Sequence, residues 1–176
     1  NSILMWFFFR KIIIFFLFVN YAHASDSLKF VDINFIVNNS ISGKNLNQII
    51  ENKNKKIKNE LNNLRKNLEE KKNKIVSQKN ILKKDELDKL VKDYENEIKK
   101  FNEIRKKKTD EFNNFNINSK KKIIDLLNPL ITSYLKKESI QILLQKDKII
   151  FGDDKLDITE EILELFNDKH KKIKFE

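Results

Sequence analysis

The stretch from Lys44 to Asn128 is 85 residues long and contains neither glycine nor proline. Glycine weakens a helix interior by about 1 kcal/mol and proline by about 3 kcal/mol, so their absence permits very long helices. An ordinary soluble helix has only about 11 to 12 residues. The stretch therefore predicts one or two helices of unusual length, and the functional argument depends on how they are arranged.

The first half of the stretch carries a narrow apolar seam. Its members follow one another at steps of 7, 4, 3, 4, 7 and 7 residues, which is the spacing of a coiled-coil contact. They are Ile50, Ile57, Leu61, Leu64, Leu68, Ile75 and Leu82. Polar residues interrupt the seam at Asn54, Lys71 and Gln78. A seam this narrow holds one partner helix, and its interruptions predict an arm that bends or splays.

A second helix is predicted to begin just after Lys83. Asp85 and Glu86 suit a first helical turn because acidic side chains offset the positive end of the helix dipole. Apolar residues then continue at helical spacing at Leu87, Leu90, Tyr94, Ile98, Phe101, Ile104, Phe112 and Phe115. We expect a turn near Lys83 to Asp85 and an antiparallel helical hairpin. One continuous helix of roughly 130 Å is the alternative, but it would separate the strand-like segments on either side.

Short segments with other patterns flank the helices. On the N-terminal side, residues 28–33 (LKFVDI) favour a strand and residues 34–42 favour a turn or a brief helical turn. The Ser42-Gly43 pair is expected to mark the start of the first helix. On the other side, Pro129 is expected to kink the second helix or mark a boundary, and residues 136–139 are expected to end it.

The C-terminal part of the chain predicts a β-hairpin and a closing helix. The segments Ile140 to Leu144 and Ile149 to Phe151 are short apolar runs, and the polar loop between them reads as a hairpin turn. Asp157 or Thr159 is a suitable N-cap for a helix over residues 160–167. We expect this helix to pack onto the strands.

Together these elements predict an α+β fold: a long antiparallel helical hairpin, mounted on a small β head with a short C-terminal helix. We divide the chain into a signal peptide (1–24), a head (25–43 and 129–176) and an arm (44–128). Three short strands and one helix bury little and leave strand edges open, so self-association through the head is expected. The candidate residues for it are Phe30, Val31, Ile33, Ile140, Ile142, Leu144, Ile149, Ile150 and Phe151.

The first 24 residues have the layout of a secretory signal peptide. Its parts are Arg10 and Lys11 as the positive region, residues 12–19 (IIIFFLFV) as the apolar core, and Ala22-His23-Ala24 as the cleavage motif. Cleavage between Ala24 and Ser25 is predicted, with Met5 as the expected initiator. An uncleaved membrane anchor is the alternative, but a spanning helix needs about 20 apolar residues and the charges interrupt this run early.

The composition argues against catalysis and metal binding. The chain has no cysteine and only two glycines, and removal of the signal peptide leaves His170 as the one histidine. Such a chain offers neither a transition-metal site nor a glycine-rich phosphate loop. No nucleophile, base and orienting group can be assembled from the pattern, so we expect no enzyme, no metal and no cofactor.

The positive charge is concentrated on the arm. The arm carries 24 lysine and arginine residues against 14 acidic residues, a surplus of +10, whereas the rest of the mature chain carries 10 against 12. A field of one sign on an elongated element attracts acidic partners. An AT-rich genome would also enrich lysine and asparagine, but it would not explain a slightly acidic head. Nucleic acid is not expected as the partner, because the signal peptide exports the chain and no recognised binding module is present.

Two sets of arm residues are candidates for binding a partner. The basic set comprises Lys71, Lys72, Lys74, Lys79, Lys83, Lys84, Arg105, Lys106, Lys107 and Lys108. We expect it to attract acidic protein segments or an anionic membrane surface, although each lysine taken singly also fits an ordinary solvated helix face. The aromatic set comprises Phe101, Phe112 and Phe115, which either contact a partner or form the core of the hairpin.

Three segments outside the arm add a specific order of parts: FVDIN (residues 30–34), IQILLQKDKIIFGDD (140–154) and LDITEEIL (156–163). With the signal peptide and the two basic helices, this order resembles the Skp (OmpH) family of periplasmic chaperones. The resemblance implies a homotrimer with a shared β-barrel head and three arms around a cavity. It also implies that the cavity holds unfolded outer-membrane proteins in the periplasm without ATP. No lipopolysaccharide-binding residues can be carried over, and a structural coiled-coil spacer or envelope tether is the alternative function.

Overall fold

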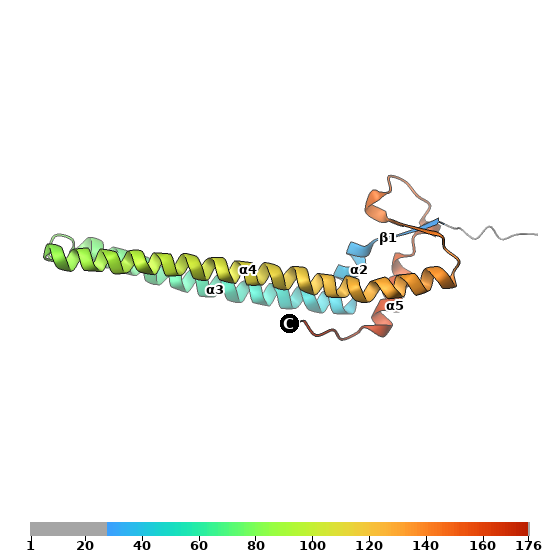
Figure 1. Ribbon diagram of the computed structural model, residues 1–176, viewed down its shortest axis with the longest axis horizontal. Coiled ribbons are helices and arrows are strands. Elements are labelled where there is room, and N and C mark those ends of the chain that lie inside the picture. Colours follow the sequence, from blue (N-terminus) through green and yellow to red (C-terminus); the bar gives the residue numbers. More distant parts are fainter. Residues whose placement is uncertain (1–27, 176) are drawn as a thin grey trace, which may run out of the picture.

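The structure is a computed structural model that describes residues 28–175 (Figure 1). The predicted signal peptide, with its cleavage position between Ala24 and Ser25, lies outside the described residues. The elements follow in the order β1 (Leu28–Val31), α2 (Ile33–Asn39), α3 (Ile41–Gln78), α4 (Lys84–Lys137), β2 (Ile142–Gln145), η1 (Lys146–Lys148), η2 (Asp154–Leu156) and α5 (Thr159–Lys169), where η marks a short 3-10 helix. They form a long helical arm with a small head at one end.

The two long helices lie side by side as an antiparallel pair (Figure 1). α3 has 38 residues and α4 has 54, which correspond to about 57 Å and about 81 Å at 1.5 Å per residue. The chain reverses after Gln78, whose carbonyl accepts hydrogen bonds from the amides of Ile81 (3.0 Å) and Leu82 (3.1 Å). Asp85 and Glu86 occupy the first turn of α4. The α+β fold class and the helical hairpin are thus confirmed, and the turn, at residues 79–83, lies a few residues earlier than the predicted Lys83 to Asp85.

The first long helix begins earlier than the sequence pattern suggests. α2 occupies most of the segment expected to form a turn or a brief helical turn, and α3 follows it at Ile41. Ser40 caps α3, since its Oγ accepts a hydrogen bond from the amide of Gly43 (3.0 Å). Gly43 is therefore inside the helix and not at its boundary. A Cβ at Gly43 would stand 2.0 Å from the carbonyl oxygen of Val37, so the glycine permits the close approach of α2 and α3.

Pro129 lies inside α4 and does not end it. The helix continues to Lys137, in agreement with the predicted end at residues 136–139. Beyond the proline, Leu130 and Ile131 are buried. The last part of α4 is therefore both the root of the arm and one wall of the head.

β1 and β2 form a two-stranded parallel sheet in which Leu28 is paired with Ile142 and Val31 with Gln145. The predicted β-hairpin between residues 140–144 and 149–151 is therefore wrong. Parallel strands require a long crossover connection, and here the whole arm serves as that crossover. Two neighbouring apolar runs have the same local pattern whether they pair with each other or with a distant strand, so sequence proximity favoured the wrong partner.

The second run of the expected hairpin does not form a strand. η1 follows β2 directly, and in the loop beyond it Ile150 and Phe151 are fully exposed. The other edge of β1 is occupied instead by the segment before α5, where the amide of Ile158 donates to the carbonyl of Phe30 (3.0 Å) and Asp157 forms a parallel bridge with Phe30. The head thus pairs its first strand with two segments from the C-terminal part of the chain.

α5 closes the head by packing mainly against α2 and α4, and not against the strands as predicted. Its buried face carries Ile162 and Phe166, neither of which has any exposed surface. Glu160 and Glu161 stand in its first turn. The helix and its acidic start are as predicted, but the partner surface is helical because the sheet has only two short strands.

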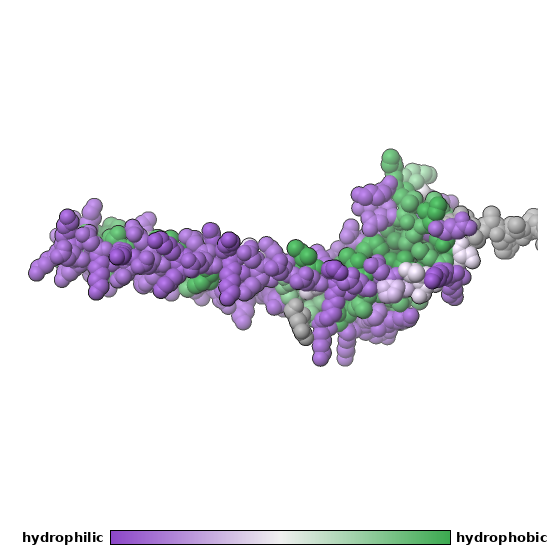
Figure 2. All heavy atoms as spheres, in the orientation of Figure 1, coloured by the Kyte–Doolittle hydropathy of each residue, from purple (hydrophilic) through white to green (hydrophobic). Residues whose placement is uncertain are grey.

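The buried apolar cluster is confined to the head and the root of the arm. Its largest fully buried members are Ile36, Leu46, Ile123, Leu127, Ile162 and Phe166. From residue 47 to residue 114, which we call the outer arm, no residue is buried. Figure 2 shows the same division, with hydrophobic residues gathered over the head and hydrophilic residues covering the arm.

Candidate functional site

The outer arm consists of two helices joined by a seam that is only half covered. Every member of the predicted α3 seam, from Ile50 to Leu82, is half-buried. Other apolar side chains lie outside the seam altogether, and Val76 and Ile81 near the tip are 65% and 81% exposed. A two-helix contact cannot enclose a side chain on all sides. The arm therefore presents a distributed set of partly open apolar groups.

The three aromatic candidates differ in their surroundings. Phe115 is buried at the arm root, where the ammonium of Lys53 on α3 lies 4.4 Å from its ring centroid. This contact between α3 and α4 is a cation–π interaction. Phe101 and Phe112 are half-buried along the outer arm. Phe115 is therefore a core residue of the folded chain, whereas Phe101 and Phe112 keep part of their surface open.

Three of the ten basic candidates are engaged in ion pairs. Lys71 pairs with Glu97 and Lys108 pairs with Glu60, so both lysines connect α3 to α4. The hydrogen bond from Lys108 lowers the pKa of Glu60. Lys107 pairs with Glu111 along α4 at 3.9 Å. Lys71 and Lys108 thus join the two helices, and the charge of all three lysines is partly neutralised.

The other seven basic candidates form no ion pair within the described chain. They are Lys72, Lys74, Lys79, Lys83, Lys84, Arg105 and Lys106, and all are exposed. Five of them surround the tip of the hairpin, and Arg105 and Lys106 lie further back on α4. The exposed, unpaired basic candidates therefore lie both at the tip, where Glu69, Glu70, Asp85, Glu86 and Asp88 accompany them, and further back on α4.

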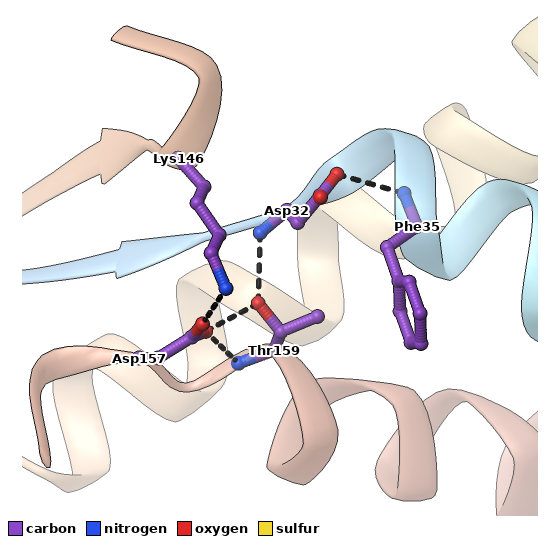
Figure 3. A network of polar contacts seen from close by, with 5 residues as sticks. All are labelled: Asp32, Phe35, Lys146, Asp157 and Thr159. Atoms are coloured by element: carbon purple, nitrogen blue, oxygen red, sulfur yellow. Dashed lines mark hydrogen bonds and ion pairs between the residues drawn. The ribbon is translucent and has the colours of Figure 1, made fainter. Parts of the chain in front are cut away.

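The Asp-Ile-Thr step of the sequence builds a polar network that ties the head together (Figure 3). Asp157 accepts hydrogen bonds from the amide of Thr159 (2.9 Å) and from Lys146 (2.6 Å). Thr159 Oγ1 donates to Asp157 and accepts from the amide of Asp32 (2.8 Å). Asp32 in turn caps α2, with its Oδ1 accepting from the amide of Phe35 (2.8 Å). The network joins the end of β1, η1 and the start of α5.

The ion pair in this network shifts the pKa of both partners. Burial acts to raise the pKa of Asp157, but the hydrogen bonds from Lys146 and Thr159 outweigh it and hold the pKa below the ordinary value of 3.8. The hydrogen bond to Asp157 also raises the pKa of Lys146. Both shifts favour the charged pair, so the network is structural and complete at neutral pH.

The head leaves an apolar surface uncovered. Of the nine candidate association residues, Phe30 and Val31 are buried within the chain, and Ile33, Ile140 and Ile149 are half-buried. Ile142, Leu144, Ile150 and Phe151 are exposed. Ile142 and Leu144 alternate along β2 with the core-facing Leu143, so they share the outer face of the sheet. The exposed set lies on β2 and the loop after η1.

The residues that follow α5 carry a role that sequence reasoning missed. Ile173 is buried in the apolar cluster and Phe175 packs against it. Lysines surround them in the sequence, and no role was predicted for this segment. The signal that could have identified it is the alternation of apolar and basic residues from Lys172 to Phe175, which is typical of an extended segment lying on an apolar surface.

Other kinds of site find no support in the part of the chain that the structure describes. No group of histidine, cysteine, aspartate or glutamate side chains there could hold a metal ion. No helix among residues 28–175 is both long enough and apolar enough to cross a membrane. The features that distinguish the molecule are its arm and its partly uncovered head.

The fold agrees with comparisons to known proteins. Residues 28–166 match the model of the family described as Outer membrane protein (OmpH-like). The chain therefore belongs to the OmpH-like family, and no curated protein matches it. Among solved structures, it is similar to a candidate outer membrane chaperone (OmpH-like) from Caulobacter crescentus CB15, with a TM-score of 0.79 and 15% identity over 87% of this chain and 90% of that one. At this identity the similarity shows a shared fold.

Proposed function

We propose that the mature protein is a periplasmic, non-enzymatic holding chaperone that binds unfolded outer-membrane proteins between its arms and keeps them from aggregating without ATP. The observation that carries the proposal is the outer arm, in which no residue is buried and apolar groups are left half open under a positive field. Membership of the OmpH-like family supports it. The Caulobacter protein of the same fold is described as a candidate chaperone, which also supports it.

The arm suits a binder that must not select one sequence. Half-covered apolar residues offer weak contacts, and several weak contacts made together give a useful hold because each binding event raises the effective concentration for the next. Exposed lysines near the tip attract acidic segments of a client before apolar contact is made. The same lysines would attract an anionic membrane surface.

Self-association through the head completes the proposal. Ile142, Leu144, Ile150 and Phe151 form an exposed apolar surface beside the open edge of β2, and such a surface on a small head favours association. We propose a homotrimer, in which three arms enclose a cavity and the exposed head residues form a shared core. Several arms would also supply the multivalency that weak contacts require.

The test is an aggregation assay with purified mature protein and a urea-unfolded outer-membrane protein diluted into buffer at low and at moderate salt. We expect the client to stay soluble, and we expect weaker protection at higher salt because the Debye length falls to about 10 Å at 0.1 M. Failure to keep the client soluble at either salt would leave the spacer or tether as the better explanation.

Matched variants separate arm charge from total charge. Replacement of Lys72, Lys74, Lys79 and Lys106 by glutamine removes four charges from the arm, whereas the same change at Lys136, Lys148, Lys169 and Lys171 removes four from the head side. We expect the arm variant to lose the salt-sensitive part of the protection and the head variant to keep it. Equal loss in both variants would mean that net charge, and not its position, is responsible.

A further inference from the structure

The segment that follows α5, residues 170–175, lies along the root of the arm (Figure 1). We call it the tail segment. Its first residue is fixed to α3, since the carbonyl of His170 accepts a hydrogen bond from the hydroxyl of Ser42. Its end is fixed to α4, where Lys122 Nζ donates to the carbonyl of Lys174 (2.9 Å). The segment lies beyond residue 166, where the match to the family model ends.

The tail segment is extended, and its side chains alternate between the helices and solvent. Ile173 is buried in the same apolar cluster as Leu46 of α3 and Ile123 of α4, and Phe175 packs against that cluster. Lys172 and Lys174 between them are exposed. Residues 170–175 contain no helix or strand, so the segment has no backbone ladder with its neighbours. It is held by two apolar side chains and by hydrogen bonds from side chains of α3 and α4.

This mode of contact is the one that an unfolded outer-membrane protein can also make. A strand destined for a membrane barrel alternates apolar and polar residues, so in extended form it presents apolar side chains on one face only. A surface that binds such a segment through alternate side chains, with few backbone contacts, does not depend on an exact sequence. The arm root holds a segment of this pattern in the folded protein.

We propose that the surface of α3 and α4 beneath the tail segment is a binding groove for extended client segments that alternate apolar and polar residues, and that the tail segment occupies this groove as an internal competitor. The inference rests on the chaperone function proposed above and places one contact site within it. The tail segment then sets a minimum affinity for clients, because only a client able to displace it gains access to the groove.

This minimum affinity arises because the tail segment is tethered to the rest of the chain. A short tether keeps a ligand at an effective concentration on the order of millimolar, so a single free segment at micromolar concentration competes poorly. A client that is already held by other arm contacts is itself present at a high effective concentration. Displacement of the tail segment would therefore accompany full engagement of a client and not a first encounter.

Release of the tail segment provides the test. In full-length mature protein, the double variant Ile173→Asn/Phe175→Asn removes both apolar anchors and keeps every lysine. The probe is a fluorescent peptide with the sequence of residues 169–175, KHKKIKF. By fluorescence anisotropy we expect it to bind the double variant at least tenfold more tightly than the unaltered protein. Equal affinity for the two proteins would overturn the proposal.

Two controls separate peptide binding in the groove from simple attraction between charges. The variant Lys171→Gln/Lys172→Gln changes the charge of the tail segment but keeps its anchors, and it should bind the peptide no more tightly than the unaltered protein. A second peptide, KHKKNKN, has the same charge but lacks the apolar alternation, and it should bind neither protein. If it binds the double variant as well as the first peptide does, attraction between charges explains the binding and the groove does not exist.

A crosslinking experiment on the unaltered tail keeps the proposal testable even if the double variant fails to fold. A photo-crosslinking residue at Asn118, an exposed position one turn before Lys122 on α4, should capture the first peptide at millimolar concentration and should not capture the second. Absence of capture would contradict the groove. A protein that captures the peptide but cannot keep an unfolded client soluble would retain the groove and refute the chaperone function, whereas client protection without capture would refute only the groove.

Discussion

The head and the outer arm of this molecule bury their apolar residues to very different extents. In the head, short elements from distant parts of the chain meet around side chains such as Ile162 and Phe166 that have no exposed surface. In the outer arm, two helices with good helix formers meet along one seam and bury no residue fully. One chain can therefore combine a closely packed head with long helical surfaces whose apolar side chains stay half exposed and can contact a partner.

The largest difference between the two regions should appear when an apolar side chain is removed. Phe166→Ala empties a fully enclosed site in the head and should lower the free energy of unfolding by about 3 to 5 kcal/mol. Leu64→Ala in the half-covered seam should lower the free energy of unfolding by only about 1 kcal/mol, because folding removes much less of this side chain from water. Urea denaturation at one fixed protein concentration measures both values. Similar losses would mean that the seam is packed as tightly as the head.

Hydrogen exchange compares the regions without any substitution. Amides of residues 47–77 should exchange on the order of 100-fold faster than those of residues 160–168, because helices with few buried contacts open locally. Mass spectrometry of the free protein resolves both segments. Uniformly slow exchange from Lys44 to Asn128 would contradict an arm that bends or splays. It would also contradict the idea that the arm adapts its shape to different clients.

A smaller effect tests the polar network that fixes the head. The pKa of Asp157 is lowered in the folded protein, so its contribution to stability is complete above the ordinary value of 3.8 and is lost as the pH falls through the lower folded value. Asp157→Ala should therefore lower the free energy of unfolding by about 1 to 2 kcal/mol at neutral pH, and the difference from the unaltered protein should shrink below pH 3.8.

The matched control for this substitution is Asp125→Ala on the arm side. Within residues 28–175, Asp125 forms an ion pair only with Lys121 one turn away (2.7 Å), and both side chains are exposed. An exposed pair of this kind contributes at most about 0.5 kcal/mol. Thermal melts of the two variants across pH 2.5 to 7 compare them directly. A pH-independent loss in Asp157→Ala would mean that the carboxylate charge is not what matters at that position.

Much of the fold could be predicted because its signals are local. The long stretch without glycine or proline, the seam spacing and the acidic pair at Asp85 and Glu86 depend only on neighbouring residues, and they predicted the helices, the turn and the antiparallel pairing. The closing helix after Thr159 was predicted for the same reason. The division into head and arm, the trimer and the residues that touch a client remain predictions.

The parts that sequence reasoning missed depend on contacts between distant residues. β2 pairs with β1 across the entire arm. The ion pairs that use Lys71 and Lys108 to join the helices could not be told from free surface charge. Ile173 and Phe175 lie in a lysine-rich segment, and their burial depends on the arm root beneath them.

The sequence by itself determined that this chain would form two long basic helices folded into a hairpin, because helix length and phase follow from propensity and from the spacing of apolar residues. Only the tertiary structure decided which strand edge is filled, which lysines are paired and which apolar side chains stay open. Those outcomes depend on what each residue meets across space, and a stretch of 85 residues lies between the segments that meet in the head.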